Sequence, residues 1–252
     1  MIETKNLTKS YGDILAVNNL NITVNSSEIY GFLGPNGAGK TTTIKILVSL
    51  LKPTSGTALI NGIDVIKEPL KTKTLIGYIP DEPLVYPKLT GREFLFFIAD
   101  IFEIPYNEAK KKIDGLFDIF SLSDRSNTLI ETYSHGMKQK LIFSAALLHD
   151  PEVLIMDEPT IGLDPQSAKL VKDIMRELSS KGKTIFMSTH IIEIAEKMCS
   201  RVGIINKGTL IAEGTINDLR EKTHDKAGDL ERLFIELTGG EDTRELIKSL
   251  ST

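Results

Sequence analysis

A glycine-rich segment carries the clearest chemical signal in the sequence. Residues 34–41 read Gly-Pro-Asn-Gly-Ala-Gly-Lys-Thr and match the pattern G-x-x-x-x-G-K-[ST]. The segment follows an apolar run at 28–33 and precedes a helical periodicity, so its backbone N–H groups can curl around phosphate oxygens at a helix N-terminus. Lys40 is expected to neutralise the β and γ phosphates, and Thr41 to ligate Mg²⁺. The predicted phosphate contacts are Gly34, Asn36, Gly37, Ala38, Gly39, Lys40, Thr41 and Thr42.

Two adjacent carboxylates follow a second apolar run. Residues 153–156 are Val-Leu-Ile-Met, which is typical of a buried strand, and Asp157 and Glu158 come next. Neighbouring side chains face opposite ways within a strand, but at its end the chain can turn both toward one site. Asp157 is the expected magnesium partner, and Glu158 is a candidate base that polarises an attacking water. An ordinary glycine-rich turn and a surface acidic pair are the alternatives, and the occurrence of both motifs together favours a nucleotide site.

The elements that must position these residues change in character along the chain. Residues 20–24 alternate apolar and polar side chains, and 57–65 form two short runs around Asn61-Gly62, so an antiparallel sheet is predicted near the N-terminus. The helical periodicity after the glycine-rich segment extends over 41–51. A region of helices, 87–150, opens with a capping box formed by Thr90 and Glu93.

Strand signals return in the last third of the sequence. Buried-type strands are predicted at 153–156 and 184–189, separated by a helix that Asp164 and Pro165 begin. Alternation of strand and helix implies a parallel sheet. The predicted fold class is therefore α/β, with a P-loop NTPase (RecA-like) core, a mixed or parallel sheet, an N-terminal antiparallel β-subdomain and an inserted α-helical subdomain.

This organisation predicts one nucleotide-binding domain over 1–220 and a C-terminal helical tail over 221–252. The core of the domain comprises 1–86 and 151–220, and the helical subdomain comprises 87–150. Within the tail, 229–237 places Leu230, Leu233, Phe234 and Leu237 on one helical face before Gly239-Gly240. This face is expected to pack on the chain's own core, with a dimer or partner contact as the alternative.

Composition limits the classes of function. The 252 residues are 41% hydrophobic and carry a formal net charge of −4, which is typical of a globular protein without a basic footprint for nucleic acid. The single cysteine, Cys199, forms no internal disulfide and suits a reducing compartment. No signal peptide and no run of about 20 apolar residues is present, so we expect a cytosolic protein unless a partner holds it at a membrane.

A third motif indicates to which family of nucleotide-binding proteins the sequence is similar. Residues 133–140 read Tyr-Ser-His-Gly-Met-Lys-Gln-Lys and resemble the L-S-G-G-Q signature of the ATP-binding cassette (ABC) family. Ser134 is a good N-cap for the following helix, so it offers a hydroxyl and a positive dipole end to an anion, although a merely capped helix would look the same. Residues 161–164 resemble the family's D-loop, and His190 resembles its switch histidine. Tyr11 matches the aromatic residue that stacks on adenine.

The resemblance covers about residues 1–215 and implies an ATPase that uses ATP and Mg²⁺. It implies that Ser134 and Gly136 contact ATP bound to another cassette, in a homodimer or a cassette heterodimer, and that His190 contacts the γ-phosphate. Asp81 stands where the family has a glutamine near Mg²⁺ and is a further candidate metal ligand. His135 and Met137 replace a glycine and a glutamine of the usual signature.

The same resemblance implies a separate integral membrane permease, with transport in the direction of export. The chain would then be cytoplasmic and peripheral on the cytoplasmic face of the membrane, with no nucleic acid partner. Two alternatives remain open from the sequence: an ABC-type ATPase acting on nucleic acid or the ribosome, and a P-loop kinase. The transported substrate would be selected by the permease.

Overall fold

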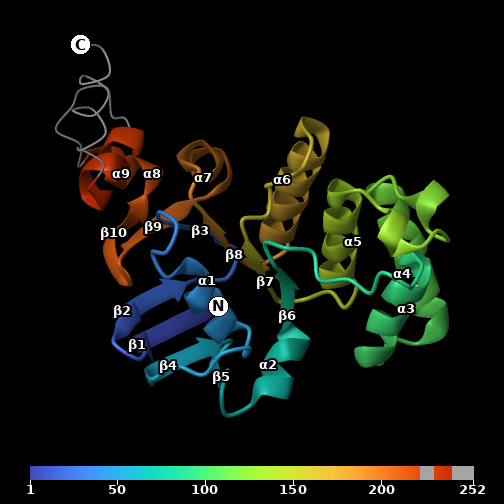
Figure 1. Ribbon diagram of the computed structural model, residues 1–252, viewed down its shortest axis with the longest axis horizontal. Coiled ribbons are helices and arrows are strands. Elements are labelled where there is room, and N and C mark those ends of the chain that lie inside the picture. The colour runs from blue at the N-terminus through green and yellow to red at the C-terminus, as the bar shows by residue number, and fades with distance from the viewer. Residues whose placement is uncertain (222–229, 240–252) are drawn as a thin grey trace.

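The structure is a computed structural model that describes residues 1–221 and 230–239. Two lobes lie side by side in Figure 1: a larger lobe contains both sheets, and a smaller lobe on the right is helical. Among the described residues, no helix is both long enough and apolar enough to span a membrane.

The central sheet has six strands in the order β10-β9-β3-β8-β7-β6. All of its neighbouring strands are parallel except β10, which pairs antiparallel with β9. Every residue of β3, β7 and β8 is buried, as expected for a parallel sheet covered on both faces. Its strands are β3 Ile29–Leu33, β6 Ile76–Ile79, β7 Val153–Asp157, β8 Thr184–Thr189, β9 Arg201–Asn206 and β10 Thr209–Thr215. The predicted parallel sheet is confirmed.

A second, antiparallel sheet has the order β2-β1-β4-β5. Its strands are β1 Ile2–Tyr11, β2 Ile14–Val24, β4 Ser55–Ile60 and β5 Ile63–Asp64. The predicted Asn61-Gly62 hairpin joins β4 to β5, with both residues at positive φ, 48° and 79°. The sequence prediction found only the last part of β2 and missed β1, in which the exposed pair Lys5 and Asn6 interrupts the alternation of buried and exposed side chains.

Six helices accompany the sheets within the part of the chain that the structure describes. They are α1 Lys40–Leu47, α2 Pro69–Leu75, α6 Pro165–Ser180, α7 Ile192–Met198, α8 Ile216–Glu221 and α9 Leu230–Thr238. The predicted extension of the first helix to residue 51 is wrong. Ser49 adopts a left-handed φ of 59°, and the N–H groups of Leu50 and Leu51 both turn back to the Lys45 carbonyl, which ends the helix.

The smaller lobe is formed by α3 Gly91–Ile101, α4 Tyr106–Ile119 and α5 His135–Leu147, with 3₁₀ turns at Ser123–Arg125 and Ile130–Thr132. The predicted capping box at Thr90 and Glu93 is confirmed, with both reciprocal hydrogen bonds present. Buried aromatic side chains from all three helices, including Phe94, Phe117 and Phe143, join one apolar cluster that continues onto the central sheet. A second cluster fills the space around α1 between the two sheets.

The last described helix packs on the body of the protein. Leu233 is buried and Phe234 packs against the first apolar cluster, so the expected packing on the chain's own core is confirmed for these two residues. The expectation is wrong for Leu237, which is 36% exposed near the end of the helix. Gly239 follows the helix at a φ of 89°, as a glycine that ends a helix does. The Leu230 side chain, Gly240 and the rest of the predicted tail lie outside the described residues.

Candidate nucleotide site

A pocket of about 200 Å³ lies where the glycine-rich loop meets the carboxyl ends of the central strands. Ligands of parallel α/β sheets bind at this edge. The pocket brings together most of the side chains that the first two motifs singled out. Its lining residues are Ala16, Asn36, Gly37, Gly39, Lys40, Thr41, Thr42, Asp81, Asp157 and Glu158. Gly34 and Ala38 belong to the same loop but are not among the lining residues.

Glycine is required where the loop enters α1. Gly39 has a φ of 108°, and a Cβ atom there would lie 2.3 Å from the backbone oxygen of Ala16 on β2. Gly34 is equally tight, because a Cβ atom would meet the Ile205 carbonyl at 2.5 Å. The antiparallel sheet and β9 therefore press against the loop and hold its backbone in the curled form that presents N–H groups to phosphate.

Lys40 lies at the floor of the pocket. Its ammonium donates to the carbonyls of Gly34, at 2.7 Å, and Pro35, at 3.2 Å, and lies 3.7 Å from Glu158 Oε1. Burial lowers the pKa of Lys40, while the carboxylates of Glu158 and then Asp157 oppose that shift. A phosphate in the pocket would find this cation already positioned and only partly neutralised.

Asp157 and Glu158 both turn into the pocket, although they are neighbours at the end of β7. Glu158 adopts a φ of 48°, which is uncommon for a residue with a side chain and swings its carboxylate to the same side as that of Asp157. Asp157 is 2% exposed and Glu158 9% exposed. The predicted turn at the strand end is thus present, and its physical basis is this left-handed backbone.

The three predicted magnesium ligands share the pocket. Thr41, Asp81 and Asp157 supply the hydroxyl and carboxylate oxygens that Mg²⁺ prefers. Among the described residues, no three His, Cys, Asp or Glu side chains gather closely enough to hold a metal by themselves. The donor set therefore fits a cation that takes its remaining ligands from phosphate and water. Burial, followed by the charges of Asp157 and Glu158, raises the pKa of Asp81.

The structure places His190 beside the acidic pair and Tyr11 farther out. His190 follows β8, and its Nδ1 atom lies 2.8 Å from Glu158 Oε1. Tyr11 lies at the tip of the β1–β2 hairpin, is 48% exposed and is not among the lining residues, although Ala16 of the same hairpin is. Its only ring contact within the described residues is with the Lys9 ammonium, at 5.1 Å.

The third motif lies outside this pocket. Ser134 caps α5 by accepting a hydrogen bond from the Met137 N–H, as predicted, but neither Ser134 nor Gly136 lines the pocket. Instead, the first turn of α5 packs on the loop after Glu158. A Cβ atom on Gly162 would come within 2.6 Å of the His135 ring. Ser134 at the capped helix end is exposed and lies outside this chain's own pocket.

Sequence reasoning missed two residues of the site. Ala16 was missed because nothing in its type marks it, and only the folding of the hairpin brings it to Gly39. Ser188 on β8 was missed although its hydroxyl donates a short hydrogen bond to Asp157 Oδ1. Its position two residues before His190 was the available signal, because parallel pairing places it opposite Asp157.

With the geometry established, comparison with known proteins identifies the family. Residues 17–161 match the family model described as ABC transporter. The chain belongs to the ABC transporter family. The linearmycin resistance ATP-binding protein LnrL of Bacillus subtilis (strain 168) is 40% identical over 219 residues, covering 87% of this chain and 70% of LnrL. The bacitracin transport ATP-binding protein BcrA of Bacillus licheniformis is 43% identical over 223 residues, covering 88% of this chain and 72% of BcrA.

Solved structures agree with this assignment. A structure described as the ATP binding subunit of an ABC transporter has a TM-score of 0.89 and 33% identity, covering 94% of this chain and 99% of that one. A dimeric post-hydrolysis state of the ATP-binding cassette MJ0796, bound to ADP and Pi, has a TM-score of 0.76 and 26% identity, covering 85% of this chain and 98% of that one. The chain is thus an ABC cassette that binds and hydrolyses ATP. The relatives favour the transporter interpretation over a nucleic-acid or ribosome ATPase and over a kinase.

Proposed function

We propose that this ABC cassette powers a separate integral membrane permease by closing head to tail on a second cassette, with ATP between them. The observation that carries this proposal is the split of the predicted ATP contacts. The phosphate loop, Asp157 and Glu158 share one pocket, whereas Ser134 and Gly136 lie outside it on the capped end of α5. A second cassette, identical or different, supplies its own Ser134-type helix end to the ATP bound in this chain's pocket.

Within one half of the site, each residue acts through what it touches. The loop N–H groups and Lys40 bind the phosphates, and Glu158, freed from Lys40 when phosphate takes its place, orients the attacking water as a general base. His190 holds the Glu158 carboxylate and reaches the γ-phosphate. Tyr11 stacks on adenine. Mg²⁺, held by Thr41 and Asp157 with Asp81 nearby, supplies charge neutralisation of the phosphates when bound.

Glu158→Gln tests the catalytic part of this proposal. The amide keeps the shape of the side chain but cannot act as a base, so we expect ATP binding to persist while hydrolysis falls on the order of 10²-fold or more. Size-exclusion chromatography with light scattering should then show an ATP-dependent dimer. Glu152→Gln is the matched control, because Glu152 lies at the other end of the β7 region, half exposed and paired with Lys183. Near-normal turnover of Glu158→Gln would remove Glu158 from the role.

Ser134→Ala tests the head-to-tail part. Since Ser134 lies outside its own chain's pocket, the variant should bind ADP as tightly as the wild type but dimerise and hydrolyse ATP more weakly. A mixture of the Ser134→Ala and Lys40→Ala proteins gives a more specific test. That mixed dimer has one site with both defects and one intact site, so it should recover part of the activity that each variant lacks alone. Full activity of Ser134→Ala as a monomer would contradict the arrangement.

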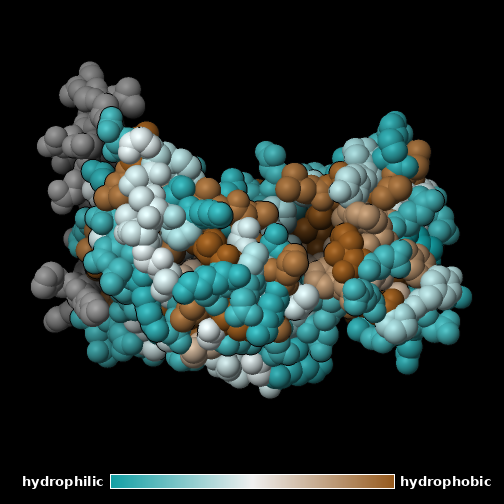
Figure 2. Space-filling view, turned by 90° about the horizontal axis from the view of Figure 1, so that it is seen from below, coloured by the Kyte–Doolittle hydropathy of each residue, from teal (hydrophilic) through white to brown (hydrophobic). Residues whose placement is uncertain are grey.

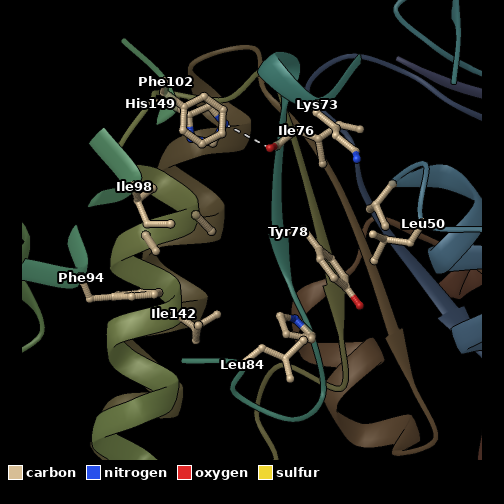
Figure 3. Close-up of a pocket in the computed structure, with 14 residues that line it drawn as sticks. Leu50, Lys73, Ile76, Tyr78, Leu84, Phe94, Ile98, Phe102, Ile142 and His149 are labelled. Atoms are coloured by element: carbon tan, nitrogen blue, oxygen red, sulfur yellow. Dashed lines mark hydrogen bonds between the residues drawn. The ribbon is translucent and has the colours of Figure 1, made fainter. Parts of the chain in front are cut away.

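An apolar groove between the two lobes is the observation that supports a contact with the permease. The groove has a volume of about 360 Å³, and its wall is almost entirely hydrocarbon. Figure 3 shows Phe94, Ile98 and Ile142 on the helical side facing Leu50, Ile76 and Tyr78 on the sheet side. In Figure 2 hydrophobic side chains gather in this hollow between the lobes. Leu84, 72% exposed, stands at the rim.

Exposed apolar surface of this kind marks a protein contact. We assign the groove to a cytoplasmic segment of the permease, which places the cassette on the cytoplasmic face of the membrane, and we assign no nucleic acid partner. The names of the relatives, linearmycin resistance and bacitracin transport, support export as the direction. We also propose the division into a core of 1–86 and 151–220, a helical subdomain of 87–150 that carries the permease contact, and a tail of 221–252.

Leu84→Asp tests the groove in the complex of this chain with the integral membrane protein that co-purifies with it. A charge at the rim should abolish co-purification with the permease while leaving the ATPase activity of the isolated cassette unchanged. Leu70→Asp is the control, because Leu70 is 80% exposed on α2 but does not line the groove. Equal loss in both variants would indicate a general surface effect, and loss in neither would contradict the assignment of the groove.

A further inference from the structure

Ser188 lies behind the acidic pair rather than in the pocket. It is fully buried in β8, and parallel pairing with β7 sets it opposite Asp157. Its hydroxyl donates to Asp157 Oδ1 and accepts from the Glu158 N–H at 3.2 Å. The carbonyl of Ser188 also accepts from that N–H, again at 3.2 Å. One residue therefore contacts both carboxylate-bearing residues that the proposed function assigns to hydrolysis.

Each contact has a separate effect on geometry. Within residues 1–221 and 230–239, the Ser188 hydroxyl is the only hydrogen-bond donor to the Asp157 carboxylate, so it fixes the rotation of that group through Oδ1 and leaves Oδ2 without a donor. Glu158 is held at its uncommon φ of 48° where its N–H meets Ser188. That backbone turn directs the Glu158 carboxylate toward Lys40 and His190. The hydroxyl and the carbonyl of Ser188, which both accept from the Glu158 N–H, therefore help to hold the turn.

We propose that Ser188 is a positioning residue for ATP hydrolysis, which orients Asp157 for the metal and fixes the turn that aims Glu158. The inference rests on the proposed roles of Asp157 and Glu158. Groups that hydrogen-bond to a metal-ligating carboxylate set its orientation, and their removal weakens metal affinity or activity roughly tenfold to a hundredfold. Ser188 does this without touching nucleotide, since it does not line the pocket.

The test is Ser188→Ala with Ser144→Ala as the matched control. Ser144 is equally buried, and its hydroxyl bonds to the Lys140 carbonyl at 3.0 Å inside α5, remote from the pocket. We measure, for both variants, kcat and KM for ATP, the ADP dissociation constants with Mg²⁺ and with EDTA, and the melting temperature. A purely structural role predicts that the two variants behave alike.

For Ser188→Ala we expect kcat to fall roughly tenfold to a hundredfold with KM for ATP little changed. The gain in ADP affinity that Mg²⁺ gives should shrink several-fold, while binding in EDTA stays as in the wild type. Ser144→Ala should keep the wild-type kcat and KM for ATP and the wild-type ADP dissociation constants. Ser188→Thr, which keeps the hydroxyl, should restore the Mg²⁺ gain, and if the alanine variant does not fold, Ser188→Cys is measured in its place.

The inference would be overturned if, for Ser188→Ala, kcat and the increase in ADP affinity caused by Mg²⁺ were both within twofold of the values for Ser144→Ala. Asp157→Asn and Glu158→Gln separate this result from failure of the proposed function. If those two variants lose activity and Ser188→Ala does not, only the role of Ser188 is refuted. If all three keep full activity, the proposed roles of the acidic pair fail as well.

Discussion

Arg201 on β9 makes the densest set of polar contacts outside the nucleotide pocket, and its removal gives a sharp prediction. Its guanidinium bonds to Glu28 at 2.6 Å and to Glu213 at 2.9 Å, and also donates to the Thr23 carbonyl of β2. It stacks over the Tyr30 ring at 5.0 Å, and the Tyr30 hydroxyl donates to Glu213 at 2.8 Å. The side chain thus ties the antiparallel sheet to three strands of the central sheet.

Arg201→Ala leaves two carboxylates without their cation in a mostly dry setting, since the side chains of Glu28 and Glu213 are only 11% and 29% exposed. Breaking a fully buried pair costs about 3–5 kcal/mol, so for this partly exposed pair we expect a loss of about 2–4 kcal/mol in the free energy of unfolding. For a chain of this length, that loss lowers the melting temperature by about 5–15 °C.

The assay is urea denaturation together with calorimetry of the nucleotide-free protein. Lys197→Ala is the control, because its pair with Glu193 is 3.3 Å long but both side chains are mostly exposed, and such pairs contribute about 0.3–0.5 kcal/mol. Arg201→Met keeps the aliphatic stem and separates lost packing from lost charge. If Arg201→Ala cost no more than Lys197→Ala, the reasoning from burial would be refuted.

Three further predictions concern single positions. Burial raises the pKa of the Cys199 thiol to about 12, so thiol reagents at pH 8 should label it only after unfolding, and rapid labelling of the native protein would contradict its burial. Gly39→Ala should abolish nucleotide binding because its Cβ would clash with the Ala16 carbonyl, whereas Gly182→Ala, at a φ of 92° with open space, should bind normally. Burial and neighbouring carboxylates raise the pKa of Asp81, so the folded state is disfavoured once that group ionises. Asp81→Asn should therefore raise the melting temperature on the order of 1 °C above the pH at which Asp81 ionises, with no gain in acid.

The sequence allowed prediction of those parts of the fold whose signals are local. The Asn61-Gly62 hairpin needs two positive φ angles, and the Thr90 cap needs a glutamate three residues later. Both features are therefore determined by a few neighbouring residues and can be predicted from them. The first helix was predicted too long because its end depends on Ser49, whose hydroxyl bonds to the distant Val65 carbonyl. Residue type alone does not reveal such a tertiary contact.

The residues of the site also fall into two groups, those that a sequence pattern predicts and those that only the folded structure reveals. Lys40, Asp157 and Glu158 were found because a phosphate loop and a strand-end carboxylate pair are sequence patterns, and the pocket does collect them. Ser188 was missed because its importance comes from the register of two strands that are distant in sequence. Its place two residues before His190 was the only sequence signal, and it is the pairing of β7 with β8 that sets its hydroxyl against Asp157.

The short segment that follows β6 contributes to both cavities described above. Pro80 lines the apolar groove and Asp81, the very next residue, lines the phosphate pocket. A single peptide unit therefore belongs to two surfaces at once, and a shift of that unit in one cavity must move it in the other. Substitutions in the two cavities should consequently show non-additive free energies when they are combined across this link, even where their side chains never meet.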